Sequence, residues 1–207
     1  MKKQLAVVFV LAIVIGGILF VATRKESQDE EEVKIVAIAT LMSHPALDSV
    51  RQNAKKELER QGFVEGENIR YIERNANGQS QVAASIANQL ASQDPDVILA
   101  ITTPMAQAVA KVARCPVVFG AVTDPVGAGL VDSLDRGEDT ITGTSDAWPY
   151  EDQLKLIRRI SPSAKRLGLL YNPGEAASQY GVKQIQRYAP GLGFELVEGS
   201  VSSTTEV

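Results

Sequence analysis

Short apolar runs alternate with amphipathic stretches along the chain from residue 33 onward. The runs have the length and β-branched content of strands, whereas the stretches between them repeat apolar residues every three or four positions, as helices do. The predicted strands are 33–40, 69–72, 97–101, 116–122 and 141–144; the predicted helices contain Leu47, Val50, Ala54 and Leu58, then Val82, Ile86 and Leu90, then residues 104–113.

Turn residues mark where these elements begin and end. Pro45 suits the first turn of a helix, and Gly62 suits the cap at its end. Strands separated by helices of about 10 to 15 residues indicate βαβ crossovers, and therefore a parallel sheet with helices on both faces. The sequence thus predicts a doubly wound α/β lobe over residues 33–145.

The alternation restarts after Ser145 and predicts a partial second α/β lobe over residues 146–207. With two strands and two helices, such a lobe would have a bare sheet edge and an under-filled core, which compact domains avoid. The chain is then either a fragment, or this unit packs as an appendage on the first. Its predicted elements are a helix at 150–160, a strand at 166–171, a helix containing Val182, Ile185 and Tyr188, and a strand that begins at Phe194.

The first 23 residues have the pattern of a membrane anchor. Lys2 and Lys3 precede an unbroken apolar run from Leu5 to Ala22, and about 18 residues suffice to span a bilayer, whereas a signal-peptide core usually has about 7 to 15. We therefore favour an uncleaved signal anchor over a cleaved signal peptide. Residues 24–32 are charged and predict a solvated tether. Either way, we expect the body of the protein outside the cytoplasm, in the periplasm or at the outer face of the membrane.

The composition excludes some classes of protein. The chain is 44% hydrophobic and 22% charged, with a net charge of −4 and a pI near 5.2, so a long disordered chain and a basic nucleic-acid binder are both disfavoured. Cys115 is the sole cysteine, which excludes an intrachain disulfide and a paired-cysteine zinc site.

Polar residues follow several predicted strands at the point where each one ends. In open α/β sheets small molecules bind beyond the carboxyl ends of the strands, so these residues are candidate ligand contacts. The alternative is that each one only caps the helix that follows, since caps use the same residue types. A cap is the better interpretation of any single position, and a ligand cleft is the better interpretation of several at one edge. The candidates are Thr40, Ser43, His44, Thr102, Thr103, Asp124, Asn172 and Glu175.

The candidate chemistry favours recognition over turnover. His44 is the sole histidine, and no G-x-S-x-G, Walker A or G-x-G-x-x-G motif is present. We therefore expect no enzyme, no cofactor and no metal; the acidic run 29–32 is most simply solvated. Two competing classes stay open: an exported enzyme on the same fold, which would need His44, Asp124 or Glu175 as its base, and a membrane-tethered sensor.

Five strings carry a family resemblance: residues 44–48, 102–108, 117–131, 141–146 and 170–176. They resemble those of the ABC-transporter substrate-binding protein family, nearest to the branch of TrpX-type proteins that bind tryptophan or tyrosine. The string from Val122 to Val131 (VTDPVGAGLV) is quite specific, and the others support it in combination. The resemblance extends in order from about Val33 to Val207.

This resemblance implies a type I periplasmic-binding-protein fold, in which two doubly wound lobes close on a ligand. The hinge would lie near residues 145–149, and the partner would be an ABC permease in the membrane. Two departures stand out. Family members are commonly lipoproteins or cleaved secreted proteins, whereas this chain has an apolar anchor and no lipobox cysteine, and family members continue well past the position of Val207.

Combined with the residues, the resemblance implies an amino acid as the ligand, possibly an aromatic one. Thr102, Thr103 and the adjoining helix N-terminus would hold its carboxylate, and Asp124 with Glu175 its ammonium group. Trp148 has two interpretations: it stacks on an aromatic ligand, or, more often for an isolated tryptophan, it pins a crossover strand. Asp124 also suits the first position of an Asp-Pro turn. The remaining polar contacts would come from Ser43, His44 and Asn172.

Overall fold

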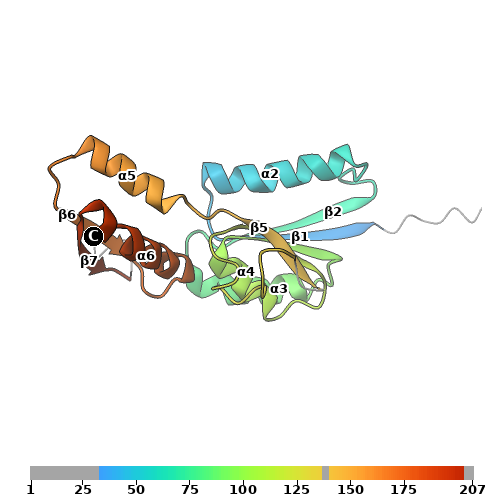
Figure 1. Ribbon diagram of the computed structural model, residues 1–207. Helices are drawn as coiled ribbons and strands as arrows, with labels where there is room; N and C mark the ends of the chain where they lie inside the picture. Colours follow the sequence, from blue (N-terminus) through green and yellow to red (C-terminus); the bar gives the residue numbers. More distant parts are fainter. Residues whose placement is uncertain (1–32, 137–139, 203–207) are drawn as a thin grey trace, which may run out of the picture. The chain divides into compact units, whose positions relative to one another are not determined.

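A computed structural model describes residues 33–136 and 140–202 (Figure 1). The predicted anchor, 1–23, and the predicted tether, 24–32, lie outside the described residues, so both stay predictions. Within the described ranges no helix combines the length and the apolar character that crossing a bilayer requires.

The first lobe is built on a parallel sheet of five strands, as the sequence predicted. Its strand order is β2-β1-β3-β4-β5, and every neighbouring pair is parallel. Because the chain passes from β1 to the β2 side first and then returns to β3, the order reverses between β1 and β3, which is where such sheets bind ligands. The strands are β1 (Lys34–Thr40), β2 (Ile69–Asn75), β3 (Val97–Ile101), β4 (Val117–Val122) and β5 (Ile141–Ser145).

Helices cover both faces of this sheet, and the alternation of side chains along β1 shows why. Val36 and Ile38 belong to the apolar cluster beneath α2, whereas Ala37 and Ala39 belong to the cluster on the side of α3 and α4. Figure 1 shows α2 on one side of the strands and α3 with α4 on the other. The helices are α2 (Pro45–Arg60), α3 (Ala83–Ala91, preceded by a short 3-10 turn, Ser80–Val82) and α4 (Thr103–Ala110).

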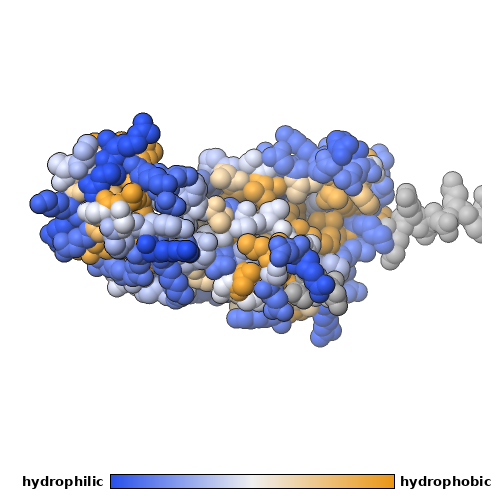
Figure 2. Space-filling view, viewed as in Figure 1, coloured by the Kyte–Doolittle hydropathy of each residue, from blue (hydrophilic) through white to orange (hydrophobic). Residues whose placement is uncertain are grey.

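Helix α2 lies on the sheet without fully burying any of its residues. Its outer side is hydrophilic, and apolar side chains gather between the helix and the sheet (Figure 2). The helix begins at Pro45, and Gly62 follows its end with a φ of 96°, a left-handed conformation that glycine adopts at little cost. Both ends agree with the sequence prediction.

The second described lobe is smaller. Its two strands pair in parallel, and both helices contribute side chains to one apolar cluster around Leu154, Ala189 and Phe194. Side chains of the opposite face stay exposed, and Leu170 is 63% accessible to solvent. The elements are α5 (Tyr150–Ile160), β6 (Arg166–Tyr171), α6 (Ala176–Tyr188), a 3-10 turn (Pro190–Leu192) and β7 (Glu195–Ser200).

Candidate ligand-binding site

The carboxyl edge of the first sheet gathers most of the predicted contact residues. Thr40 ends β1, where its strand neighbours are Asn75 of β2 and Ile101 of β3. Thr102 follows Ile101 directly, so Thr40 and Thr102 lie at adjoining strand ends, on either side of the point where the strand order reverses. The structure thereby brings six of the eight candidates to one edge: Thr40, Ser43, His44, Thr102, Thr103 and Asp124.

Thr102 has a strained backbone. Its φ of 89° and ψ of 154° lie in a region that is essentially restricted to glycine, at a cost of about 1 to 3 kcal/mol. The surrounding structure fixes this conformation, because the amide donates to the Gly120 carbonyl at 3.0 Å and the carbonyl accepts from the Ala106 amide at 2.9 Å. Strain of this kind concentrates at functional sites.

The hydroxyl of Thr102 is buried and has no hydrogen-bond partner in the described part of the chain. Leaving such a group unpaired costs about 1 to 3 kcal/mol. The hydroxyl does not cap α4 either, although Thr102 occupies the capping position. An unsatisfied hydroxyl therefore lies beside a helix N-terminus, whose dipole favours an anion. Thr103, the first residue of the helix, is itself buried.

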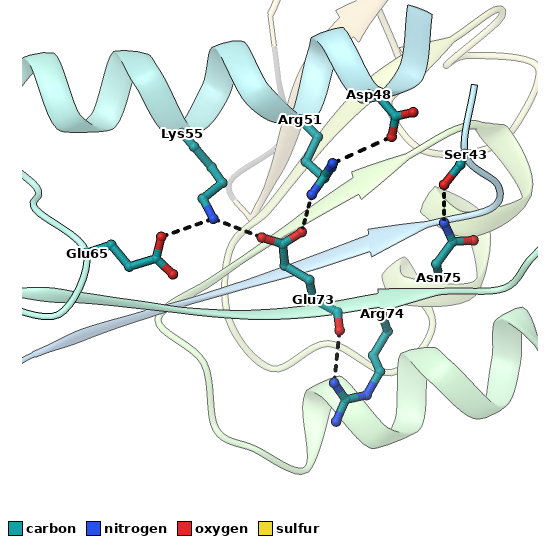
Figure 3. Close-up of polar contacts among 8 residues, drawn as sticks. All are labelled: Ser43, Asp48, Arg51, Lys55, Glu65, Glu73, Arg74 and Asn75. Carbon is teal, nitrogen blue, oxygen red and sulfur yellow. Dashed lines mark hydrogen bonds and ion pairs between the residues drawn. The ribbon is translucent and has the colours of Figure 1, made fainter. Parts of the chain in front are cut away.

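His44 and Ser43 follow β1 and both are exposed. The Nδ1 atom of His44 accepts a hydrogen bond from the Ala46 amide at 3.3 Å, which makes His44 the cap of α2. The capping interpretation is confirmed for this residue. The Oγ atom of Ser43 accepts from the Asn75 side-chain amide at 3.1 Å (Figure 3).

Asp124 forms the Asp-Pro turn that its sequence context favoured. Its Oδ1 atom accepts a hydrogen bond from the Gly127 amide at 2.9 Å. A Cβ atom at position 127 would collide with the Asp124 carboxylate, so a larger residue there would displace the carboxylate from this position. The turn holds a partly exposed carboxylate just beyond the end of β4.

Asn172 and Glu175 lie together in the second lobe, between β6 and α6. Asn172 accepts from the Gly174 amide at 2.9 Å and donates to the Glu175 carboxylate at 3.4 Å. The turn thus orients both side chains. That these two residues and the six of the first lobe contact one ligand stays a prediction.

Trp148 lies between β5 and α5 and is 58% exposed. Its ring is therefore not buried against a crossing strand, as the second interpretation of this residue would require. It lines a hollow of about 290 Å³ together with Tyr150, Tyr180 and Tyr188. The rings of Tyr150 and Tyr180 meet edge to face, with centroids 6.1 Å apart. Burial raises the pKa of Tyr150 above its usual value. Stacking of Trp148 on a ligand stays a prediction.

Sequence reasoning missed a polar pocket beside Thr40 and Ser43. It has a volume of about 180 Å³ and lies between the first turns of α2 and the ends of β1 and β2 (Figure 3). The signal was present in the acidic and basic residues of α2 at helical spacing and in the polar character of β2, but both patterns are typical of solvated faces. The additional lining residues are Asp48, Arg51, Glu73, Arg74 and Asn75.

Ion pairs form one wall of this pocket. Glu73 accepts from Arg51 at 2.6 Å and from Lys55 at 2.9 Å, and Lys55 also pairs with Glu65 at 3.2 Å (Figure 3). Burial alone would raise the pKa of Glu73, but the hydrogen bonds from Lys55 and Arg51 outweigh it and hold that pKa below its usual value. Glu73 is therefore a structural carboxylate, fixed between the strand and the helix.

Among the described residues, no group of His, Cys, Asp or Glu side chains has the arrangement of a metal site. His44, one of the three residues that an enzyme on this fold could use as a base, uses one ring nitrogen to cap α2. The arrangement at the sheet edge offers hydrogen-bond donors, a helix N-terminus and carboxylates, which are groups suited to holding a zwitterion.

The family comparison gives the class of protein. Residues 35–207 match the ABC transporter substrate binding protein family, and the chain belongs to it. The family resemblance noted in the sequence is thereby confirmed.

Individual relatives agree with this assignment. A tyrosine-binding protein from Clostridioides difficile is 33% identical over 96% of this chain. A conserved domain protein from Vibrio cholerae is 38% identical with a TM-score of 0.81, and an ABC domain from Streptococcus pneumoniae in complex with L-Trp is 30% identical with a TM-score of 0.79; each comparison covers 84% of this chain. The chain spans 62% of the length of the tyrosine-binding relative and 60% and 59% of the two solved chains.

Proposed function

We propose that this protein is the substrate-binding component of an ABC importer and captures an amino acid at the carboxyl edge of its first sheet. The observation that carries the proposal is Thr102, whose strained backbone and unpaired buried hydroxyl lie beside the N-terminus of α4. Family membership and relatives named for binding tyrosine or L-Trp support the same ligand class.

The ligand's carboxylate pairs with the Thr102 hydroxyl and the first turn of α4, which satisfies the buried hydroxyl. Its ammonium group pairs with Asp124, and Glu175 of the second lobe adds a second carboxylate. The remaining polar contacts come from Thr40, Ser43, His44 and Asn172. A ligand held by residues of both lobes favours the closed arrangement of the protein, because it binds that arrangement more tightly.

We also propose that the protein works outside the cytoplasm, anchored by residues 1–23, and delivers its ligand to a permease. The apolar run from Leu5 to Ala22 supports this location. A fusion of alkaline phosphatase after Val207 tests it, since that enzyme is active only when exported. Activity in the membrane fraction is expected, and an inactive cytoplasmic fusion would contradict the location.

A thermal-shift screen of the purified chain against all amino acids tests the ligand class. A ligand present at about 100 times its Kd stabilises by about 2.7 kcal/mol, which corresponds to a rise in Tm of roughly 5 to 10 °C for a chain of this size. We expect L-tyrosine or L-tryptophan to produce such a shift and the matched amides, which lack the carboxylate, to produce none. No shift with any amino acid would contradict the proposal.

A further inference from the structure

The polar pocket beside Thr40 lies on the α2 side of the sheet edge. Along each strand alternate side chains share a face, and Val36 and Ile38 of β1 face α2. Thr40 therefore faces α2 as well, and so does its neighbour Asn75, which lies two positions beyond Glu73 on β2. The pocket therefore lies on the α2 side of the sheet, at the end of the row formed by Val36, Ile38 and Thr40.

The pocket and the proposed carboxylate site are separated by about the width of two strands. Thr40 pairs with Asn75 on one side and with Ile101, which precedes Thr102, on the other. Neighbouring strands lie about 4.8 Å apart, so the ends of β2 and β3, which carry Asn75 and lead into Thr102, are roughly 10 Å apart. That span is comparable to an aromatic amino acid extended from its carboxylate to the far end of its ring.

The hydrogen-bond pattern of the pocket leaves both a donor and an acceptor available. Ser43 acts as the acceptor for Asn75 at 3.1 Å, so its own hydroxyl hydrogen stays available to donate. The other polar atom of Asn75, Oδ1, already accepts from the Asn77 amide at 2.7 Å. The Asp48 carboxylate is 3.6 Å from Arg51, longer than a hydrogen bond, and provides an acceptor.

The charges of the pocket are balanced. Arg51 and Lys55 bind Glu73 closely, and Arg74 donates to the Glu73 backbone carbonyl at 2.9 Å. A charged ligand side chain would have to compete with these contacts, whereas a neutral polar group need not. The lining therefore favours a neutral side chain that can both donate and accept a hydrogen bond.

We propose that this pocket recognises a hydroxyl at the end of the ligand's side chain, so that the protein prefers tyrosine to phenylalanine and tryptophan. The inference rests on the proposed function and adds the specificity of the same site. A phenol accepts from Ser43 and donates to Asp48, whereas an indole N–H only donates and a phenyl ring does neither. A site that pairs with a ligand hydroxyl discriminates strongly against the analogue that lacks it, because its own polar groups are then left unpaired.

Calorimetric titration of the purified chain with L-tyrosine, L-phenylalanine and L-tryptophan tests the inference. We expect L-tyrosine to bind at least tenfold more tightly than L-phenylalanine, with L-tryptophan also weaker. The variant Ser43→Ala should reduce the tyrosine-to-phenylalanine ratio about tenfold by weakening only tyrosine binding. Asp48→Ala, which removes the acceptor, provides a second variant with the same expectation, and Ser49→Ala, an exposed serine outside the pocket, is the matched control.

The outcomes separate this inference from the proposed function. Equal affinities for the three amino acids, or a loss in Ser43→Ala that is the same for tyrosine and phenylalanine, would overturn the role of the pocket while leaving amino-acid capture intact. Absence of binding by every amino acid would instead overturn the proposed function on which the inference rests.

Discussion

The two lobes are built from the same kinds of strands and helices, but their apolar cores differ in how completely they are buried. In the first lobe, helices cover both faces of the sheet, and residues such as Ile98 and Met105 are fully buried. In the second lobe, the helices build one small cluster, and Ile160 and Leu170 are 73% and 63% exposed. Apolar burial grows with each covered face, so the comparison shows that alternating βα sequence alone does not produce a well-filled core.

In the second lobe, the polar contacts of one residue of α5 add to the small apolar cluster. Arg158 of α5 donates to the carbonyls of Leu192, Pro162 and Ala164 at 3.0, 3.1 and 2.5 Å, and its guanidinium lies 3.9 Å from the centre of the Phe194 ring. It thereby joins the helix to the two connections that flank β7 and β6. In the first lobe, Lys55 of α2 makes a comparable contact, with its Nζ atom 4.1 Å from the centre of the Tyr71 ring.

The largest expected effect comes from the core of the first lobe. Ile98→Ala removes a fully buried side chain from the apolar cluster between the sheet and helices α3 and α4, and should lower the free energy of unfolding by about 2 to 5 kcal/mol. Denaturant unfolding measures the loss. Val118→Ala, on β4 and 37% exposed, is the control and should cost less than about 1 kcal/mol. Equal losses in the two variants would contradict the described burial.

A smaller effect is expected in the second lobe from Arg158→Met. The change keeps a long side chain in place but leaves three carbonyls without their donor, so the free energy of unfolding should fall by about 1 to 3 kcal/mol. Hydrogen exchange should show faster exchange in α5 and β7 and unchanged protection in β1 and β3. Arg159→Met, at an exposed neighbouring position, should change the free energy of unfolding little. A loss of exchange protection in both lobes would contradict the view that Arg158 stabilises the second lobe alone.

The ion pairs between α2 and β2 should contribute least. Glu73→Gln breaks contacts that are about one third exposed, so we expect a loss of about 1 to 2 kcal/mol, between the values for surface and buried pairs. Glu67→Gln, in an exposed turn, is the control.

The effect of Glu73→Gln should depend on pH. Because the folded pKa of Glu73 is lower than its usual value of 4.5, its contribution is fully present above the unfolded pKa and disappears as the pH falls through the folded pKa. Wild type and Glu73→Gln should therefore differ in Tm near pH 7 and converge in acid. A difference that persists unchanged below the folded pKa would contradict this assignment.

Much of the fold could be predicted from the sequence because the apolar period changes clearly between strands and helices. The strands β1 and β3 and the helix α5 begin or end within one residue of the prediction. The strand β2 extends to Asn75 instead of ending at 72, since Glu73 is polar yet paired with α2. The local sequence pattern does not show that a polar side chain is paired with a cation that is remote in sequence but close in space.

The candidate site was predictable in part. Strand ends in a parallel sheet meet at one edge, so the placement of Thr40, Thr102 and Asp124 followed from topology alone. The conformation of Thr102 and the pocket at Asn75 did not, because both depend on contacts between elements remote in sequence. Backbone strain at a threonine leaves no trace in propensity or spacing.

The glycine variant of Thr102 tests the central claim most directly. Thr102→Gly removes the unpaired hydroxyl and relieves a conformation that favours glycine, so the unfolding free energy should stay constant or rise by up to about 2 kcal/mol. At the same time, the affinity for L-tyrosine measured by calorimetry should fall at least tenfold. A Thr102→Gly protein that is less stable and binds the amino acid as tightly as wild type would contradict the account.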